Sequence, residues 1–470
     1  MRRVPGRITI TLVGGGGSRV PVIYDGLRRR TPRLGAVTLR LHDVDAAALA
    51  RVTTVLRGMD EAAAGGRAHG GGRNGTAGPV EVTATTDLAE ALDGADFVLT
   101  AIRAGGFAGR HLDETVPVAH GVLGQETVGP GGFALAARHV PALRRVAEAM
   151  REHCPDAWMI NLTNPAGLVT QALVPLLGAR VVGVCDSPLS LGRGVARVLG
   201  VPPGALHLEY GGLNHLGWLS GAWLDGVDVL PEVLATRDVD RIEEVGLFGA
   251  DEVRRLGAVP NEYVYFYERT SSALANIAQG TGSRGAFLLD QDRRLAAAIA
   301  AAGGPREALA AYRESLKVRQ ETYLALEARV DRPPATDVLA SAGGYHEMAL
   351  SVVEAIAVDR GAVLIVNTTN RGALPFLDGD DVVEVPSVVR AAGVFPLAAR
   401  VPDSRQPLVE QVKAFERATV HALDHGSVAA AVAALAAHPL VPSAEVAARI
   451  LDEYRHRSPA VAAALGGGPC

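Results

Sequence analysis

The chain has 470 residues, enough for two or three domains of ordinary size that each bury a hydrophobic core. Hydrophobic residues make up 48% and charged residues 21%, which excludes a disordered or fibrous chain. The 46 Lys and Arg against 51 Asp and Glu leave a formal net charge of -5, without the basic surplus of a nucleic-acid-binding protein.

The first predicted elements are a strand, a glycine turn and a helix. Residues 8–13 form a β-branched apolar run, and Gly14 to Gly17 follow directly. Glycines let a backbone approach a pyrophosphate closely, and the N-terminus of the next helix supplies unpaired N–H groups. We interpret Gly14, Gly15 and Gly16 as a dinucleotide-binding turn. Their spacing is more compact than G-x-G-x-x-G, and a plain strand-to-helix turn is the alternative.

A second apolar run, residues 37–42, ends at Asp43. A carboxylate at the end of the second strand can bind the ribose hydroxyls of NAD and repels the 2′-phosphate of NADP. Asp43 therefore predicts NAD as the cofactor, and Asp45 is the alternative residue for this role.

Further short apolar runs alternate with helical segments, at residues 80–83, 97–102, 158–162 and 181–184. This alternation predicts a parallel, doubly wound sheet of the Rossmann type. Half of the stretch at residues 65–78 is glycine, and we interpret it as a flexible surface loop.

The second half of the chain has a different pattern. Hairpin-like segments at residues 206–224 lead into long Ala-rich amphipathic helices and a late strand at residues 362–367. We therefore predict an α/β protein with a Rossmann-like domain at residues 1–200, a mixed α+β domain at residues 201–457 and a flexible tail at residues 458–470.

Polar residues follow several predicted strands. Arg103 follows the strand at residues 97–102, and Asn164 follows the strand at residues 158–162. Glu126 lies in a second glycine-rich loop. Glycine-rich loops can bring Arg103 and Glu126 close to a ligand, and the alternative is an ordinary surface loop. Ligands of open α/β sheets bind at the carboxyl ends of the strands, which makes Asn164 a candidate contact. From the residues alone, an Asx-type turn before proline is the favoured interpretation of Asn164.

Cys185 and Asp186 lie 30 residues before His215. A thiolate and an imidazole are good ligands for a divalent transition metal, and Asp186 adds an acid or another ligand. Two protein ligands would leave positions open for a substrate. Because buried thiols and core histidines are more common than metal sites, the pattern alone leaves both interpretations open.

Three tyrosines alternate at Tyr263, Tyr265 and Tyr267. Alternating aromatic residues most often form one packed face of an element, which is the favoured interpretation from the residues alone. A tyrosinate acting as a base would need a nearby cation to lower its pKa of about 10.

Cysteine content and hydropathy predict a cytoplasmic protein. The three cysteines are too few for a disulfide framework, and the short apolar run behind the basic N-terminus breaks into glycines, unlike a signal peptide. No segment reaches the roughly 18 apolar residues of a membrane span. We expect neither a nucleic acid nor a membrane as a partner.

Together these stretches resemble glycoside hydrolase family 4, the NAD- and manganese-dependent glycosidases, and most closely its 6-phospho-β-glucosidase branch. The likeness covers most of the chain. Its motifs are Gly14-Gly15-Gly16, Asp96-Phe97 with residues 102–106, residues 124–132, residues 161–167, the Cys185 segment, residues 212–215 and residues 382–386.

The resemblance implies roles for the metal ligands and the substrate contacts. Cys185 and His215 match the two metal ligands of the family. Arg103, Asn164 and Arg284 match its substrate contacts.

Three further residues match catalytic positions. Tyr263 matches the catalytic tyrosine, because Arg284 then lies at about the family's distance downstream, and Tyr265 and Tyr267 remain alternatives. Glu126 matches a residue that raises the basicity of that tyrosine. Asp186 matches the acid of the phospho-α-glucosidase branch, whereas the β branch more often has Asn, so the anomeric preference stays open.

The resemblance also implies a mechanism. NAD takes a hydride from sugar C3, Tyr263 removes the proton from C2, and a divalent ion on Cys185 and His215 stabilises the enediolate. Asp186 protonates the departing oxygen, water adds, and the hydride returns to C3. Such enzymes are exceptions to hydrolysis by two carboxylates.

We accordingly expect NAD and Mn2+ or another divalent metal as cofactors, with the metal and the substrate bound in the second domain. The substrate is a phosphorylated glycoside, the architecture is similar to that of lactate and malate dehydrogenases, and the assembly is a homodimer or homotetramer. Two alternatives remain. One is a malate- or lactate-type dehydrogenase, which leaves Cys185 and His215 unexplained. The other is a catalytically silent NAD-binding regulator.

Overall fold

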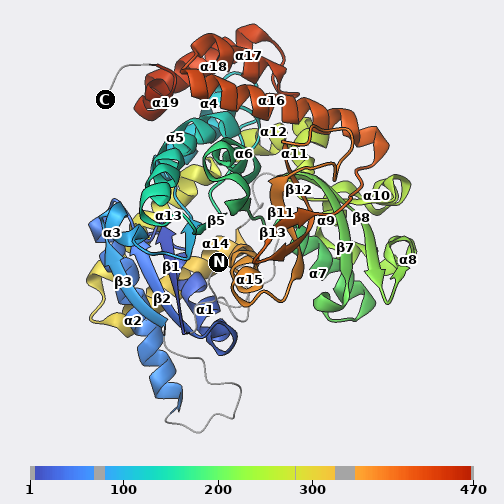
Figure 1. Cartoon of the computed structure of the whole chain (residues 1–470). Helices are drawn as coiled ribbons and strands as arrows, with labels where there is room; N and C mark the ends of the chain where they lie inside the picture. The colour runs from blue at the N-terminus through green and yellow to red at the C-terminus, as the bar shows by residue number, and fades with distance from the viewer. Residues whose placement is uncertain (1–5, 68–79, 281, 323–343, 467–470) are drawn as a thin grey trace.

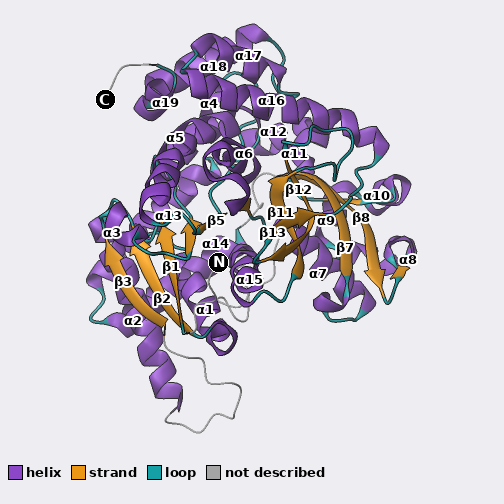
Figure 2. Ribbon diagram, in the orientation of Figure 1, coloured by secondary structure: helices purple, strands orange, loops and turns teal. Residues whose placement is uncertain are grey.

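A computed structural model of the chain describes residues 6–67, 80–280, 282–322 and 344–466. Within these ranges the strands form one mixed sheet, and helices cover both of its faces (Figures 1 and 2). The strands are β1 (Arg7–Val13), β2 (Ala36–His42), β3 (Val80–Thr85), β4 (Phe97–Thr100), β5 (Trp158–Asn161), β6 (Val181–Gly183), β7 (His207–Leu213), β8 (Leu216–Leu224), β9 (Val227–Asp228), β10 (Val259–Pro260), β11 (Ala362–Thr369), β12 (Val382–Arg390) and β13 (Gly393–Pro396).

Helices make up most of the remaining described chain. They are α1 (Val20–Leu34), α2 (Ala46–Arg67), α3 (Leu88–Leu92), α4 (Gly106–Ala119), α5 (Gly129–His153), α6 (Ala166–Leu177), α7 (Ser187–Leu199), α8 (Leu230–Ala235), α9 (Glu243–Phe248), α10 (Ala250–Leu256), α11 (Val264–Glu268), α12 (Thr270–Gln279), α13 (Arg284–Ala301), α14 (Pro305–Glu321), α15 (Tyr345–Val358), α16 (Gln406–His425), α17 (Val428–Ala437), α18 (Ala444–Arg457) and α19 (Pro459–Ala464). Short 3-10 turns add η1 (Gly178–Arg180), η2 (Pro203–Ala205), η3 (Arg237–Arg241) and η4 (Asp403–Arg405).

The first six strands confirm the predicted parallel sheet. Their order is β3-β2-β1-β4-β5-β6, and every neighbouring pair is parallel. Each of the six predicted apolar runs in this half overlaps one of these strands. The carboxyl ends of β1, β4, β5 and β6 lie along one edge, from which the glycine turn and the loops of Arg103, Asn164 and Cys185 begin.

The sheet continues without a break into the second half of the chain. β11 pairs antiparallel with β6, through Asn367 and Gly183, and β12, β7, β8 and β10 follow in antiparallel order. The predicted hairpin at residues 206–224 is β7 and β8, and the predicted late strand is β11. The division at residue 200 stays a prediction, since the pairing of strands crosses it.

Alternating side chains of the strands enter two cores. Phe97 and Leu99 of β4 pack on one face with α1, α2, α14 and α15, and Val98 packs on the other face with α5, α6 and the C-terminal helices. A third core surrounds β7, β8 and α7 to α11. Helices α14 and α15 come from the second half of the chain, yet they pack on helices α2 and α1 of the first half.

The C-terminal helices form a layer over α4, α5 and α6 (Figure 1). The sequence predicts a flexible tail from residue 458, whereas the structure has helix α19 there, with Val461 fully buried against the second core. An alanine-rich segment with one large apolar residue on its inner face accounts for this docking.

The glycine-rich stretch at residues 65–78 is described only up to Arg67, where it forms the end of α2, and the rest lies outside the described residues. Within the described ranges, no helix combines the length and the apolar composition that crossing a bilayer requires.

Candidate active site

The glycine turn is packed so closely that side chains are excluded from it. A Cβ atom on Gly14 would lie 2.6 Å from the carbonyl oxygen of Ala101, and one on Gly16 would lie 2.5 Å from the Cβ of Ala48. Gly14 also has a φ of +96°, which favours glycine. The turn leads through Ser18 to helix α1, whose first turn leaves N–H groups without helical partners. These features fit the pyrophosphate of a dinucleotide.

Asp43 stands beside the turn, as predicted for a residue that binds ribose. Its carboxylate accepts hydrogen bonds from the N–H of Gly16 at 2.9 Å and the N–H of Asp45 at 3.1 Å. Asp45 instead accepts from the N–H groups of Ala47 and Ala48 in the first turn of α2. Asp45 therefore serves as a helix cap, and of the two carboxylates Asp43 is the one that contacts the glycine turn.

Two arginines hold Glu126. Arg103 donates to one carboxylate oxygen of Glu126 at 2.5 Å, and Arg110 donates to the other at 2.6 Å. Burial alone would raise the pKa of Glu126, but the charges of Arg103 and Arg110 outweigh burial and lower it to about 2. Glu126 is therefore a fixed negative charge that orients Arg103.

His139 ties together the loops that carry Arg103 and Asn164. Its Nδ1–H donates to the backbone oxygen of Asn164 at 2.6 Å, while its Nε2 accepts from the N–H of Ala104 at 3.1 Å. Burial, opposed by the bond to Asn164, lowers the pKa of His139 to about 3, so the ring is neutral and its tautomer is set by these two bonds. The side-chain oxygen of Asn164 is buried and has no hydrogen-bond partner among the described residues.

Cys185 and Asp186 lie between β6 and α7. The Cys185 thiol is buried and donates to the Ser187 hydroxyl at 3.5 Å, and that hydroxyl donates to Glu262 at 2.8 Å. Burial raises the pKa of Cys185, and nearby Glu384 adds to the rise. A bound cation would reverse this and favour the thiolate. Asp186 accepts a long hydrogen bond from the N–H of Gly344, at 3.3 Å.

His215 occupies the tight turn between β7 and β8, with a φ of +65°. Both of its ring nitrogens are buried without a hydrogen-bond partner among the described residues, and the ring stacks on Tyr263. Burial lowers the pKa of His215 to about 3, against the opposing charge of Glu126. A buried, neutral imidazole with unsatisfied nitrogens fits the role of a metal ligand.

Asn214 connects this turn to the other loops. Its side-chain oxygen accepts from the N–H of Ala166, two residues after Asn164, at 3.0 Å, and its amide donates to Glu384 at 3.4 Å. Glu384 also accepts from Asn367 at 2.8 Å. The charge of the same carboxylate acts on Cys185, so Glu384 connects Cys185 with Asn214, the neighbour of His215 in the chain.

Asn261 fixes the position of Tyr263. Its side-chain oxygen accepts from the N–H groups of Tyr263 and Val264 at the start of α11, and its amide donates to Tyr210 at 2.8 Å. The other two tyrosines of the alternating run face elsewhere. Tyr265 lies edge-on to Phe266, and Tyr267 lies 5.8 Å from His438 between ring centroids.

Arg284 is the first residue of α13 and is buried. It donates to the Thr322 hydroxyl at 2.6 Å and to the backbone oxygen of Arg319 at 3.0 Å. The next residue, Gly285, lies so close to α4 that a Cβ atom would come within 2.6 Å of the backbone nitrogen of His111. This contact brings Arg284 to the same helix as Arg110.

The structure thus brings His215 to Tyr263, Arg103 to Glu126 and Asp43 to the glycine turn. In the part of the chain described, no group of three or more His, Cys, Asp and Glu side chains is arranged to hold a metal ion, so the metal-ligand prediction rests on Cys185 and His215 alone. Sequence reasoning missed the supporting side chains. The motif at residues 212–215 contains Asn214, and the motif at residues 382–386 contains Glu384. His139 and Arg110 lie in no motif, so nothing in the local sequence points to them.

Comparisons with known proteins agree with these motifs. The family model "Family 4 glycosyl hydrolase" matches residues 9–201, and the model of the family's C-terminal domain matches residues 210–441. A probable 6-phospho-beta-glucosidase of Bacillus subtilis is 31% identical over 461 residues, which cover 95% of each chain.

Two solved structures have similar folds. The 6-phospho-beta glucosidase from Thermotoga maritima, solved with manganese, NAD+ and glucose-6-phosphate, has a TM-score of 0.79 at 23% identity and covers 96% of this chain and 98% of its own. A 6-phospho-alpha-glucosidase from gut microorganisms, in complex with NAD and Mn2+, has a TM-score of 0.77 at 25% identity and covers 97% and 99%. With both family models matched across nearly the whole chain, this protein belongs to glycosyl hydrolase family 4.

Proposed function

We propose that this protein is a 6-phospho-glucosidase that works with NAD and a divalent metal such as Mn2+. The observation that carries the proposal is the pair of His215 and Tyr263, in which a buried imidazole without hydrogen-bond partners among the described residues stacks on a phenol. A two-carboxylate glycosidase has no need of this pair. The named relatives, which include both β- and α-specific enzymes, support the substrate class.

Residues on four loops would hold the two cofactors. Gly14, Gly15 and Gly16 provide the side-chain-free turn for the NAD pyrophosphate, and Asp43 lies beside that turn for the ribose. Cys185 and His215 would bind the metal. When bound, NAD accepts and returns a hydride, and the metal stabilises negative charge on the sugar oxygens.

The side chains of this protein would then move protons at two sugar atoms. Tyr263 would take the proton from C2 as a phenolate, a state that a cation held by Cys185 and His215 would make accessible. Glu126 keeps Arg103 in place through the 2.5 Å bond. Asp186 donates a proton to the glycosidic oxygen as it departs. Arg103, Asn164 and Arg284 orient the sugar in this scheme.

We propose the β configuration for the substrate, on the 31% identity to the Bacillus subtilis relative. Asp186 matches the α branch at one position, so the α configuration is the competing outcome of the test below. The assembly as a homodimer or homotetramer stays a prediction, which light scattering of the purified protein measures directly.

The decisive experiment is a panel of p-nitrophenyl α- and β-glucosides, each with and without a 6-phosphate. The assay contains Mn2+, NAD+ and a thiol reductant. We expect release of p-nitrophenol from a 6-phosphorylated glucoside with no accumulation of NADH, because the hydride returns in each turnover. Accumulation of NADH would instead support the dehydrogenase alternative, and neither signal would support the silent regulator.

A further inference from the structure

A buried carboxylate in the second half of the sheet accepts hydrogen bonds from three side chains. Glu384 of β12 is fully buried. One of its oxygens accepts from the amide of Asn367 at 2.8 Å and, over a longer distance of 3.4 Å, from the amide of Asn214. The other oxygen accepts from the Tyr210 hydroxyl at 3.2 Å. Such donors offset the high cost of burying a negative charge.

Glu384 lies in a row of paired residues that crosses the sheet from β6 to β8. The members of the row, in strand order, are Gly183, Asn367, Glu384, Gly212 and Gly217. Cys185 follows the β6 member by two residues, and His215 lies in the turn that joins β7 to β8. The backbone oxygen of the β8 member accepts from the N–H of Asn261, two residues before Tyr263, at 2.9 Å. The row therefore passes through the segments that carry both metal-ligand candidates and the candidate base.

Glycines make room for the polar side chains of this row. A Cβ atom on Gly217 would lie 2.2 Å from the Tyr210 hydroxyl, and one on Gly183 would lie 2.9 Å from the Cβ of Asn367. Distances this short mean that a larger residue at either position would displace the polar side chain or the strand. The side chains that meet Glu384 are therefore closely confined.

One path of hydrogen bonds, the tyrosine path, leads from the start of α11 to Glu384. The side-chain oxygen of Asn261 accepts from the N–H groups of Tyr263 and Val264, so its NH₂ group has to face Tyr210. The Tyr210 oxygen accepts from that NH₂ group, and its own O–H donates to Glu384. Two backbone N–H groups of α11 thus fix the direction of every bond in this path.

A second path, the histidine path, reaches the other oxygen of Glu384. The side-chain oxygen of Asn214 accepts from the N–H of Ala166, which turns its NH₂ group toward Glu384. Asn214 directly precedes His215 in the β7–β8 turn. Both paths end in donors, and a carboxylate accepts at both of its oxygens, whereas glutamine accepts at only one.

We propose that Glu384 is a positioning residue that holds the His215 turn and the start of α11 in a fixed relation, so that the imidazole and the Tyr263 phenol keep their relative positions during turnover. Partners behind metal ligands orient them in this way in metalloenzymes. The inference deepens the proposed function and rests on it.

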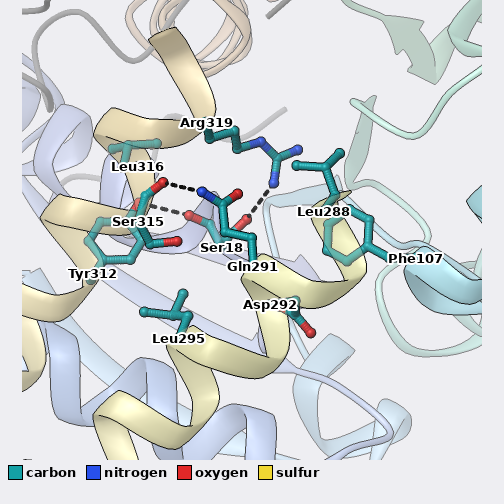
Figure 3. Close-up of a pocket in the computed structure, with 10 residues that line it drawn as sticks. All are labelled: Ser18, Phe107, Leu288, Gln291, Asp292, Leu295, Tyr312, Ser315, Leu316 and Arg319. Carbon is teal, nitrogen blue, oxygen red and sulfur yellow. Dashed lines mark hydrogen bonds between the residues drawn. The ribbon is translucent and has the colours of Figure 1, made fainter. Parts of the chain in front are cut away.

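The pocket beside the glycine turn provides an internal control. Figure 3 shows this pocket, into which Arg319 points, and its lining residues come from the glycine turn, α4, α13 and α14. The two paths run through β7, β12, the β7–β8 turn and the start of α11 instead. Substitutions in the paths should therefore leave NADH binding, followed by fluorescence, unchanged.

Tyr210→Phe and Glu384→Gln test the tyrosine path. The first removes the donor, and the second turns its one oxygen toward the two amides and its NH₂ group toward Tyr210. Each should lower kcat on the 6-phosphorylated glucoside by about 10- to 100-fold. Mn2+ affinity, measured by calorimetry, should stay within about twofold of wild type. The double variant should lose no more than either single variant, because both substitutions break the same bond.

Asn214→Ala and Glu384→Ala test the histidine path. Asn214→Ala should weaken Mn2+ binding by about 10-fold or more, since it frees the turn that carries His215. Glu384→Ala removes the acceptor of both paths and should show both losses, in Mn2+ affinity and in kcat. If this variant does not fold, Tyr210→Phe and Asn214→Ala still test the two paths separately.

Glu416→Gln is the matched control for stability. Glu416 is also a buried carboxylate, but it pairs with Lys413 on α16. Its replacement should lower the unfolding temperature and leave kcat and Mn2+ affinity near wild type. An equal loss of kcat in Glu416→Gln would reduce the role of Glu384 to fold stability and overturn the inference.

Two other results would also overturn it. One is wild-type kcat in Tyr210→Phe, and the other is a double variant whose losses multiply, which would mean that Tyr210 and Glu384 act separately. Wild-type protein that cleaves no 6-phosphorylated glucoside would end the proposed function, and the inference with it. An active wild type with unaffected variants would end the inference alone.

Discussion

The imidazole of His215 lies flat on the phenol of Tyr263, with ring centroids 3.7 Å apart and planes 13° from parallel. The contact joins the β7–β8 turn to the start of α11. A cation held by His215 would consequently lie close to the phenol, and a nearby cation is what lowers the pKa of a tyrosine enough for it to act as a base.

Replacement of Tyr263 by phenylalanine tests the base. Tyr263→Phe should lower kcat by about 10²- to 10⁴-fold, the usual contribution of a general base, and leave NAD binding intact. Tyr267→Phe is the matched control, since Tyr267 packs against His438 instead. In deuterated water the released sugar should carry deuterium at C2, as read by mass spectrometry. An unlabelled product from wild-type protein would exclude an exchanging elimination intermediate.

Replacement of Cys185 tests the metal site without relying on turnover. Cys185→Ser should weaken Mn2+ binding, measured by calorimetry, by about 100-fold or more, since even residues that only support metal ligands contribute 10- to 100-fold. Cys154→Ser is the control, because Cys154 is also a buried free thiol but lies in the core under α5. Chelation should abolish activity, and added Mn2+ should restore it. Unchanged Mn2+ affinity in Cys185→Ser would remove this residue from the site.

The charge of Asp43 should exclude NADP. Asp43→Asn retains an oxygen that can accept from the N–H of Gly16 but removes the negative charge. We expect the ratio of NADP+ to NAD+ affinity to rise by about tenfold, because a charge close to the 2′-phosphate is lost. Asp45→Asn should leave the ratio unchanged. Equal affinities of wild-type protein for the two cofactors would show that the assignment of Asp43 is wrong.

Glu126 should make the protein less stable as the pH falls. Its pKa is about 2 in the folded state, against an ordinary value of 4.5, so its stabilising effect is complete well above pH 4.5 and is lost as the pH falls through 4.5 toward 2. The full effect is about 3 kcal/mol. Urea unfolding of wild type and Glu126→Gln at pH 5.5 and 4.5 should show a steeper loss in wild type. Near pH 4.5 the free energy of unfolding of wild type should change by about 0.7 kcal/mol per pH unit more than that of Glu126→Gln. Equal changes in the two proteins would contradict the prediction.

The parts of this protein that sequence predicts are those with local signals. Strands β1, β2 and β4 are short β-branched or apolar runs that end at glycine or polar residues. The apolar run and the residues that end it are enough to identify each strand. The stacking of His215 on Tyr263 brings together residues of two separate motifs. The family resemblance assigned both roles, whereas the residues alone favoured packing for the tyrosine.

Contacts between distant segments had no such signal. Arg319 meets Ser18 across 301 positions of sequence, and α14 reads locally as an ordinary amphipathic helix. The ion pair of Arg110 with Glu126 depends on how α4 packs beside the Glu126 loop. No local sequence pattern encodes this packing. The antiparallel pairing of β11 with β6 is likewise a result of tertiary packing, because a strand's residues do not specify its neighbour.

The packing of α14 on α2, and of α15 on α1 and β5, makes the two family segments inseparable. A fragment ending near residue 200 would leave β6 as an open edge and expose the apolar side chains that meet Leu309 and Met348. Chimeras built by joining halves of two relatives therefore have to preserve the β6–β11 pairing. They also have to preserve the packing of α14 on α2 and of α15 on α1. Specificity in this protein is better re-engineered by single residues than by exchange of segments.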